Sequence, residues 1–204
     1  MLSSTKDPKR RSSCLLQSLD RFISRNRLPD AVATLPVLVH RGIRPSFGTL
    51  ARLLSKCLRS RSPWALSLGR RLHLYLHLTG SKHIYPSTPL LSNHIISLYF
   101  FLNRPDYARD LFDKMPTKNV FTYNSMLSGY ARLGMISASR RIFDKMPVRD
   151  VVSWNTMIIA FAQGGQCRNA VDFYVKLRRS SIGYNPYTFS GLVSACVRLG
   201  EFKL

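Results

Sequence analysis

An asparagine recurs at one fixed spacing along the chain, and its side chain is the first candidate for chemistry. Asn93, Asn124 and Asn155 are each separated by 31 residues. The pentapeptide FDKMP recurs at the same offset, beginning at Phe112 and again at Phe143. An asparagine amide offers a hydrogen-bond donor and an acceptor at one reach. The spacing therefore indicates a repeated unit that places the same amide group at one position in successive copies.

The residue types needed for catalysis or metal binding do not form a recognisable motif. Nine of the ten acidic residues are aspartates, and Glu201 lies three residues from the end. His73 and His77 have the i, i+4 spacing of a helical zinc site, but Leu74 stands where a metalloprotease carries glutamate, so we expect packing histidines. The sequence lacks the H-x-E and C-x-x-C of zinc deaminases, and it has no GxGxxG, Walker or GxSxG motif. We expect no enzyme activity, no metal and no cofactor.

Cysteine spacing and the apolar runs bear on the compartment of the protein. Cys14, Cys57, Cys167 and Cys196 are too far apart for a zinc pair or a compact disulfide framework, and we expect buried, reduced thiols. The longest uncharged run, residues 84–103, is interrupted by prolines, which argues against membrane insertion. Residues 1–11 are rich in serine and basic residues, so they are a possible organelle-targeting segment, while Asp7 argues against a secretory signal.

The charge of the chain is strongly positive. It has 31 Lys and Arg against 10 Asp and Glu, a formal net charge of +21, and no acidic residue occurs between Asp30 and Asp106. Such a field attracts polyanions or an anionic membrane face. A purely solvated surface normally mixes both signs, so we expect phosphate contacts from the basic residues of the acid-free stretch. They are Arg52, Lys56, Arg59, Arg61, Arg70 and Arg71.

The elements that must position these groups are pairs of short helices. In the middle copy, apolar residues recur at helical spacing from residue 126 to 133 and again from 136 to 146. Gly134 marks the end of the first helix and Pro147 the end of the second. Helices of about ten residues are marginal alone, so the hairpins must stack. The pattern predicts an all-α fold, a right-handed α-solenoid of about four hairpins plus a fragment, with the apolar residues of FDKMP packed inside.

The stretch NVFTYNSMLSGYARLGMISASRRIFDKMPVRDVVSWNTMIIAFAQGG resembles the plant pentatricopeptide-repeat family, in its subclass with repeats of mixed length. The resemblance covers about residues 12–204. It implies a degenerate repeat at 12–46, a long-type repeat at 47–88 and short-type repeats at 89–119 and 120–150. A 35-residue repeat at 151–185 and an incomplete long-type repeat at 186–204 would follow.

The resemblance also implies which residues would read RNA, because in this family the fifth and last residues of a repeat read one base together. The implied pairs are Asn93 with Asn119, Asn124 with Asp150, and Asn155 with Asn185. The second residue of a repeat sandwiches the base in this family, and it falls on Leu90, Phe121, Val152 and Tyr187. An asparagine suits a pyrimidine edge, and an adjacent aspartate, which only accepts, would fix the face that the amide presents.

The resemblance implies a sequence-selective single-stranded RNA-binding protein in organellar RNA processing, editing or stabilisation. Of the two organelles, we favour mitochondria over chloroplasts. A separate editing or processing enzyme would then act in trans. One alternative is a protein-binding helical-repeat scaffold, and another is a truncated family member with little activity. At the level of single residues, an asparagine can simply bond nearby backbone, and Asp150 before VVSW can be an N-cap.

Overall fold

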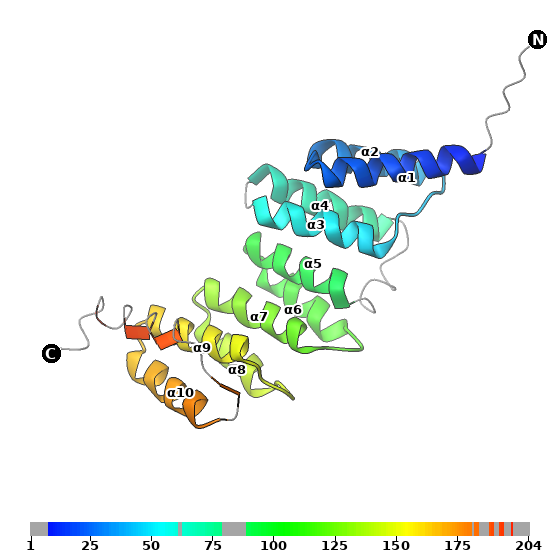
Figure 1. Ribbon diagram of the computed structural model, residues 1–204. Coiled ribbons are helices and arrows are strands. Elements are labelled where there is room, and N and C mark those ends of the chain that lie inside the picture. The colour runs from blue at the N-terminus through cyan, green and yellow to red at the C-terminus, as the bar shows by residue number, and fades with distance from the viewer. Residues whose placement is uncertain are drawn as a thin grey trace, which may run out of the picture. The chain divides into compact units, whose positions relative to one another are not determined.

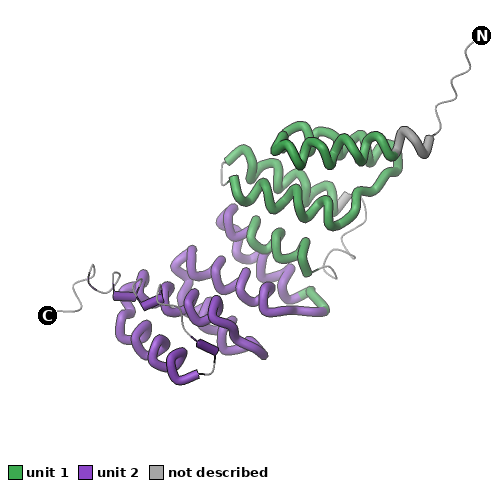
Figure 2. The backbone as a smooth tube through the Cα atoms, viewed as in Figure 1, with its two compact units in different colours: residues 1–98, 114–116 green, residues 99–113, 117–204 purple. Residues whose placement is uncertain are grey.

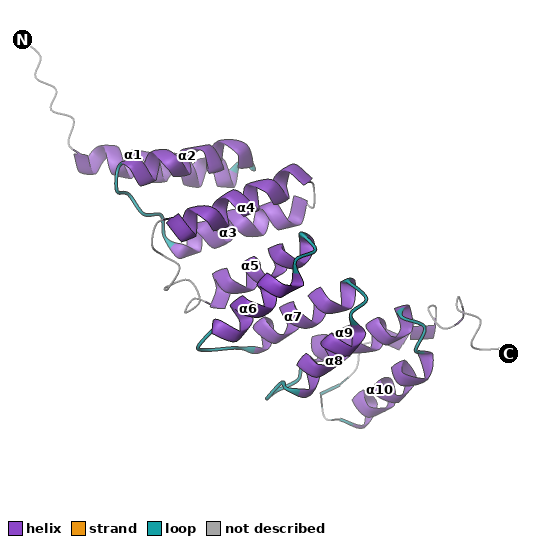
Figure 3. Cartoon of the chain, turned by 180° about the vertical axis from the view of Figure 1, so that it is seen from behind, coloured by secondary structure: helices purple, strands orange, loops and turns teal. Residues whose placement is uncertain are grey.

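The computed structural model describes residues 8–60, 63–78 and 89–180, together with 182–183, 188–189, 192–193 and 197. Within these ranges all the regular structure is helical and no strand occurs (Figures 1 and 3). The chain divides into two compact units, residues 1–98 with 114–116 and residues 99–113 with 117–204 (Figure 2). The predicted all-α class is confirmed.

The first compact unit holds the N-terminal helices. They are α1 (Pro8–Ser24), α2 (Leu28–His40), α3 (Phe47–Ser60), α4 (Pro63–Leu78) and most of α5 (Pro89–Phe101). Helix α1 packs on α2 and on α3, and α4 packs on α3 and on α2. Two antiparallel hairpins therefore stack, with first helix against first helix and second against second.

The second compact unit repeats this arrangement. It holds the end of α5, then α6 (Pro105–Lys114), α7 (Val120–Arg132), α8 (Ile136–Asp144), α9 (Val151–Gln163) and α10 (Cys167–Arg179). Helix α7 packs on α8 within its hairpin and on α9 of the next one, and α9 packs on α10. Stacked helical hairpins are the α-solenoid arrangement that the sequence predicts.

The described turns inside the hairpins share one geometry. Gly134 ends α7 with a φ of +70°, and the N–H of the next residue, Met135, donates to the carbonyl of Tyr130 at 2.9 Å. This is the Schellman bond, which satisfies a carbonyl that the helix end leaves open. The same bond follows Asn26, Asn103 and Gly165, each with positive φ. The predicted helix end at Gly134 is confirmed, and asparagine takes the glycine role at two other turns because it tolerates this conformation.

The repeated FDKMP segment packs as the sequence predicts. Its apolar residues and their leucine or isoleucine neighbours are buried, whereas the aspartate and lysine of each copy are exposed. Each phenylalanine meets an aromatic ring of the following helix edge-on, Phe112 with Tyr123 at 5.3 Å and Phe143 with Trp154 at 4.9 Å. These contacts join successive hairpins through the core. The buried set is Leu111, Phe112, Met115, Ile142, Phe143 and Met146.

The other expectations about fold and compartment are met in part. Cys57 and Cys167 are buried thiols, and Cys196 lies outside the described residues. Cys14 is exposed, which corrects the prediction of burial for it: it lies on the outer side of α1, away from buried Leu19 and Ile23. In the part of the chain that the structure describes, no helix is both long and apolar enough to cross a membrane.

Candidate nucleic-acid interface

The first helices of two hairpins in the second compact unit begin with the same polar constellation. Asn119 precedes α7 in extended conformation, and its Oδ1 accepts from the backbone N–H of Thr122 at 2.9 Å. Asp150 precedes α9 likewise, and its Oδ1 accepts from the N–H of Ser153 at 2.8 Å. Both are capping boxes, because the Thr122 and Ser153 hydroxyls accept in return from the N–H of the cap residue. Asp150 is thus an N-cap, as the alternative interpretation of the sequence expected, and so is Asn119.

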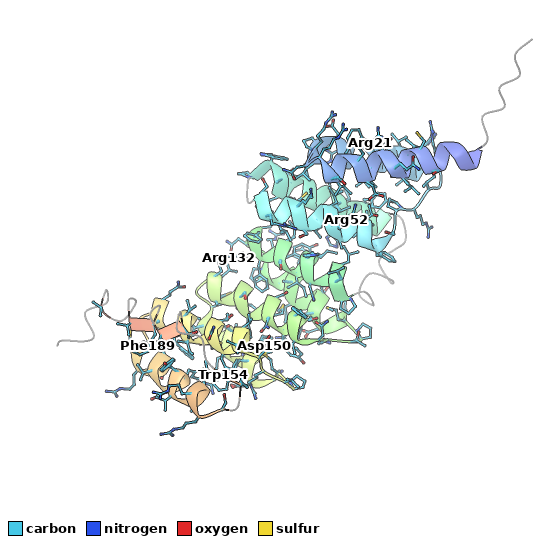
Figure 4. The ribbon with its side chains drawn as sticks, in the orientation of Figure 1. Arg21, Arg52, Arg132, Asp150, Trp154 and Phe189 are labelled. Atoms are coloured by element: carbon cyan, nitrogen blue, oxygen red, sulfur yellow. The ribbon has the colours of Figure 1, made fainter. Side chains whose placement is uncertain are left out.

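Asp150 also reaches back to the preceding hairpin. The Nδ2 of Asn124 in α7 donates to both carboxylate oxygens of Asp150, at 3.1 Å each. A carboxylate only accepts, so the amide group of Asn124 is oriented with its NH₂ toward Asp150. Asn124 and Asp150, one of the three pairs that the family resemblance implies, therefore contact each other directly. Figure 4 labels Asp150 at the start of α9 and Trp154 one turn later.

The orientation of Asn124 leaves its carbonyl oxygen without a hydrogen bond. Asn124 is 8% exposed, and its Oδ1 is buried with no partner among the described residues. The same is true of the Oδ1 atoms of Asn93 and Asn155. Buried polar atoms are nearly always satisfied, and leaving an acceptor without a donor costs about 1–3 kcal/mol. Three acceptors at the same register thus lack a donor within the part of the chain that the structure describes.

Apolar side chains stand three residues before these asparagines and face solvent. Leu90, Phe121 and Val152 are 61%, 73% and 55% exposed. Each follows the first residue of its helix, so it lies in the first turn with the asparagine one turn further on. Large exposed apolar groups that recur at one register are available to contact a flat ligand. Asn185 and Tyr187, the corresponding predictions in the last copy, lie outside the described residues.

The six basic residues predicted to contact phosphate fall into different environments. Arg52 of α3 pairs with Asp20 of α1 at 2.6 Å, and Lys56 donates to the carbonyls of Ile23 and Ser24 at the end of α1. These contacts hold α3 against α1, so both side chains have a packing role whether or not they also contact phosphate. Arg61 lies outside the described residues. The remaining three, here termed the exposed arginine set, are Arg59, Arg70 and Arg71.

Of the histidines, His73 is buried and His94 is partly buried. Burial, and secondarily the charge of Arg59, lowers the pKa of His94, which follows Asn93 in α5. His73 is 8% exposed, and the side chain of His77 lies outside the described residues. Across the described ranges, no group of three or more His, Cys, Asp or Glu side chains could hold a metal ion.

Thr122 and Ser153 were not among the candidates from the sequence. A signal for them existed, since a hydroxyl residue follows Asn119 and Asp150 at the same interval of three residues. That interval is the capping-box spacing.

Family models and known proteins match the chain over most of its length. A model described as the PPR repeat family matches residues 149–198, and a PPR repeat model matches residues 92–120 and 121–151. Pentatricopeptide repeat-containing protein At2g21090 of Arabidopsis thaliana is 42% identical over 97% of this chain and 32% of its own length. The mitochondrial protein At3g53360 of Arabidopsis thaliana is 39% identical over 76% of this chain and 15% of its own. Another Arabidopsis relative is named chloroplastic.

A solved structure shares the fold. The pentatricopeptide repeat protein PPR10, in complex with an 18-nucleotide psaJ RNA element, superposes with a TM-score of 0.71 at 13% identity, over 92% of this chain and 28% of that one. The chain spans about a third or less of the lengths of these relatives. The family-model matches together run from residue 92 to 198, more than half of the 204 residues. The chain therefore belongs to the pentatricopeptide repeat family.

Proposed function

We propose that the chain is a sequence-selective single-stranded RNA-binding module that acts in organellar RNA processing, editing or stabilisation. One observation carries the proposal: a buried asparagine oxygen without a donor recurs in three successive repeats. The RNA bound to PPR10 and the mitochondrial and chloroplastic names of relatives support it. Of the two organelles we favour mitochondria. Repeat lengths of 31, 31 and 35 residues in the sequence support the mixed-length subclass.

The orientation of Asn124 favours uracil at the base that it reads with Asp150. Because its NH₂ is turned toward Asp150, Asn124 presents its Oδ1, which is an acceptor, on the other side of the amide. Uracil has an N–H at ring position N3, whereas cytosine has an acceptor at the same place. A uracil N–H that reached Oδ1 would supply the missing donor, and a cytosine would set two acceptors against each other.

The remaining repeats read neighbouring bases in this proposal. Asn93 with Asn119 and Asn155 with Asn185 accept pyrimidines, with cytosine favoured. Leu90, Phe121, Val152 and Tyr187 sandwich the bases, which replaces part of the stacking that free RNA loses on binding. The three described members of that group are all exposed.

The exposed arginine set contributes phosphate contacts to this binding. Its guanidinium groups face solvent on α3 and α4, in a stretch of sequence without acidic residues. Catalysis in this proposal comes from a separate editing or processing enzyme. The chain supplies recognition and holds the RNA in register.

A protein-binding scaffold is the rival function, and one feature favours it. A pocket of about 400 Å³ lies between α2 and α4 in the first compact unit. Its walls include Val32, Leu35 and Val39 of α2 and Leu74 of α4, and Arg71 and His40 also line it. An apolar pocket with basic groups suits a protein partner, but it would not account for asparagines that recur at one register in another part of the chain.

Competition binding with four RNAs tests the proposal. The RNAs are long, synthetic and identical except at the base assigned to Asn124 and Asp150. We expect the wild-type protein to prefer uracil and Asn124→Thr to shift the preference toward guanine, because a hydroxyl presents a different pattern of donor and acceptor. Asn169→Thr, at an exposed asparagine that bonds Gln166 in α10, is the matched control and should bind as wild type. If the wild type and Asn124→Thr rank the four bases identically, Asn124 is a structural residue and base reading is refuted.

A further inference from the structure

A hydroxyl stands at the third residue of several repeats, and its contacts recur. Thr122 bonds Asn119, and Ser153 bonds Asp150. Near the start of α3 the N–H of Thr49 donates to the Ser46 hydroxyl, which donates to the Thr49 hydroxyl at 3.1 Å. Thr188 has the same place in the last repeat, and its hydroxyl is buried without a partner in the described part of the chain. For Thr49, Thr122 and Ser153 the bonding partner is the last residue of the preceding repeat.

The contact with Asn119 determines what that side chain can offer. Its Oδ1 accepts from both the N–H and the hydroxyl of Thr122, at 2.9 Å each. The Thr122 hydroxyl at the same time accepts from the N–H of Asn119 at 3.3 Å. With its oxygen engaged twice, exposed Asn119 is left with its NH₂ as the group that can contact a ligand. The amide is therefore held in one of its two orientations and presents a donor.

The Ser153 hydroxyl acts on Asp150 less directly, because it bonds the backbone of Asp150 and not its side chain. The Ser153 hydroxyl accepts from the N–H of Asp150 at 2.9 Å and donates to the Asp150 carbonyl at 2.7 Å. It therefore fixes the backbone of Asp150, while the Ser153 N–H holds one carboxylate oxygen. The carboxylate so placed is the one that orients Asn124.

We propose that Thr122 and Ser153 are positioning residues that set base preference, by holding the last residue of the preceding repeat in one orientation. This inference rests on the proposed function. Thr122 makes Asn119 a donor, which favours the N3 acceptor of cytosine over the N3–H of uracil. Ser153 holds Asp150 so that Asn124 presents an acceptor, which favours uracil. The third residue of a repeat thus acts on recognition without touching RNA.

The test measures preference separately from affinity. The full chain is titrated with the same long RNA, varied between cytosine and uracil at the base assigned to Asn93 and Asn119. Thr122→Val keeps the branched shape of this fully buried side chain and replaces the hydroxyl by a methyl group, which cannot hydrogen-bond. We expect the cytosine-to-uracil affinity ratio to fall by roughly two- to tenfold, the effect of removing one hydrogen bond. Thr122→Ser should restore the ratio. Thr34→Val, at a threonine of α2 that bonds the Ala31 carbonyl, should leave it unchanged.

A second variant keeps the test decisive if Thr122→Val does not fold. Ser153→Ala should reduce the uracil preference at the base assigned to Asn124 and Asp150. The factor should be smaller than for Thr122→Val, because the Ser153 hydroxyl bonds the backbone of Asp150 and not its carboxylate. It should leave the base assigned to Asn119 unaffected. If these variants weaken binding to all bases by one common factor, the hydroxyls are helix caps only and the inference is overturned. If the wild-type protein shows no base preference at all, the proposed function itself fails.

Discussion

Asp150→Ala should destabilise the second compact unit by about 2–5 kcal/mol. The variant removes the N-cap of α9, which is worth about 1 kcal/mol. It also leaves the NH₂ of Asn124, a residue only 8% exposed, without its carboxylate acceptor, at a cost of about 1–3 kcal/mol. Removing a negative charge from the start of a helix adds about 0.3–1 kcal/mol. Asp150→Asn keeps a side-chain oxygen for both contacts, so it should reduce stability by only about 1 kcal/mol.

Urea denaturation followed by far-ultraviolet circular dichroism would measure these changes, with hydrogen exchange of the first turn of α9 as a local readout. A stack of hairpins need not unfold in one step, so the local readout identifies which part of the stack is destabilised. Asp144→Ala is the matched control. Asp144 pairs with Arg140 one turn away, both are about half exposed, and such a pair contributes about 0.3–0.5 kcal/mol. If Asp150→Ala costs no more than Asp144→Ala, Asp150 does not hold Asn124, and the orientation argument for uracil is refuted.

Three further predictions concern packing, charge and pH. Gly129→Ala would place a Cβ 2.1 Å from the ring of buried Phe100, so urea denaturation should show a decrease in stability of about 1–3 kcal/mol, whereas Ser128→Ala at an exposed position should not. Changing the exposed arginine set to alanine should make RNA binding less dependent on salt: the slope of log affinity against log salt concentration should fall by about 0.7 for each phosphate that the variant no longer neutralises. An unchanged slope would mean that these arginines do not contact the RNA. Because folding lowers the pKa of His94, protonation favours the unfolded chain, so stability should fall as the pH drops below about 6.5. His94→Gln should reduce that pH dependence in denaturation curves at several pH values.

The helical hairpins could be predicted from the sequence because their determinants are local. Apolar spacing of three and four residues specifies which side of a helix is buried, and Leu111 and Ile142 are buried as that spacing requires. Gly134 ends a helix through its own backbone conformation. Cys14 shows the limit of an argument from residue type, because its position on α1 decided its exposure and cysteine preference did not.

The contacts of the basic residues could not be predicted in the same way. The partner of Arg52 is Asp20, which lies 32 residues earlier, and Lys56 binds carbonyls at the end of α1. Such pairing depends on which helices stack and on how they are aligned along their axes. A run of like charges in the sequence predicts neither. A charge count predicts the sign of the electrostatic field at the surface. Which basic side chains are open to a ligand is known only after those paired within the fold have been identified.

In the proposed function, stability and recognition are coupled at Asp150. One carboxylate begins α9 and orients Asn124 of α7, so the bond that joins two successive hairpins is also the bond that decides which atom Asn124 presents. Asn124 and Asp150 are 26 residues apart in sequence, so a residue inserted or deleted within a helix between them would shift the cap relative to the amide. In this proposal hairpin stacking and base preference constrain the same side chain, and a substitution that changes one also changes the other unless, as in Asp150→Asn, it preserves an oxygen at the capping position.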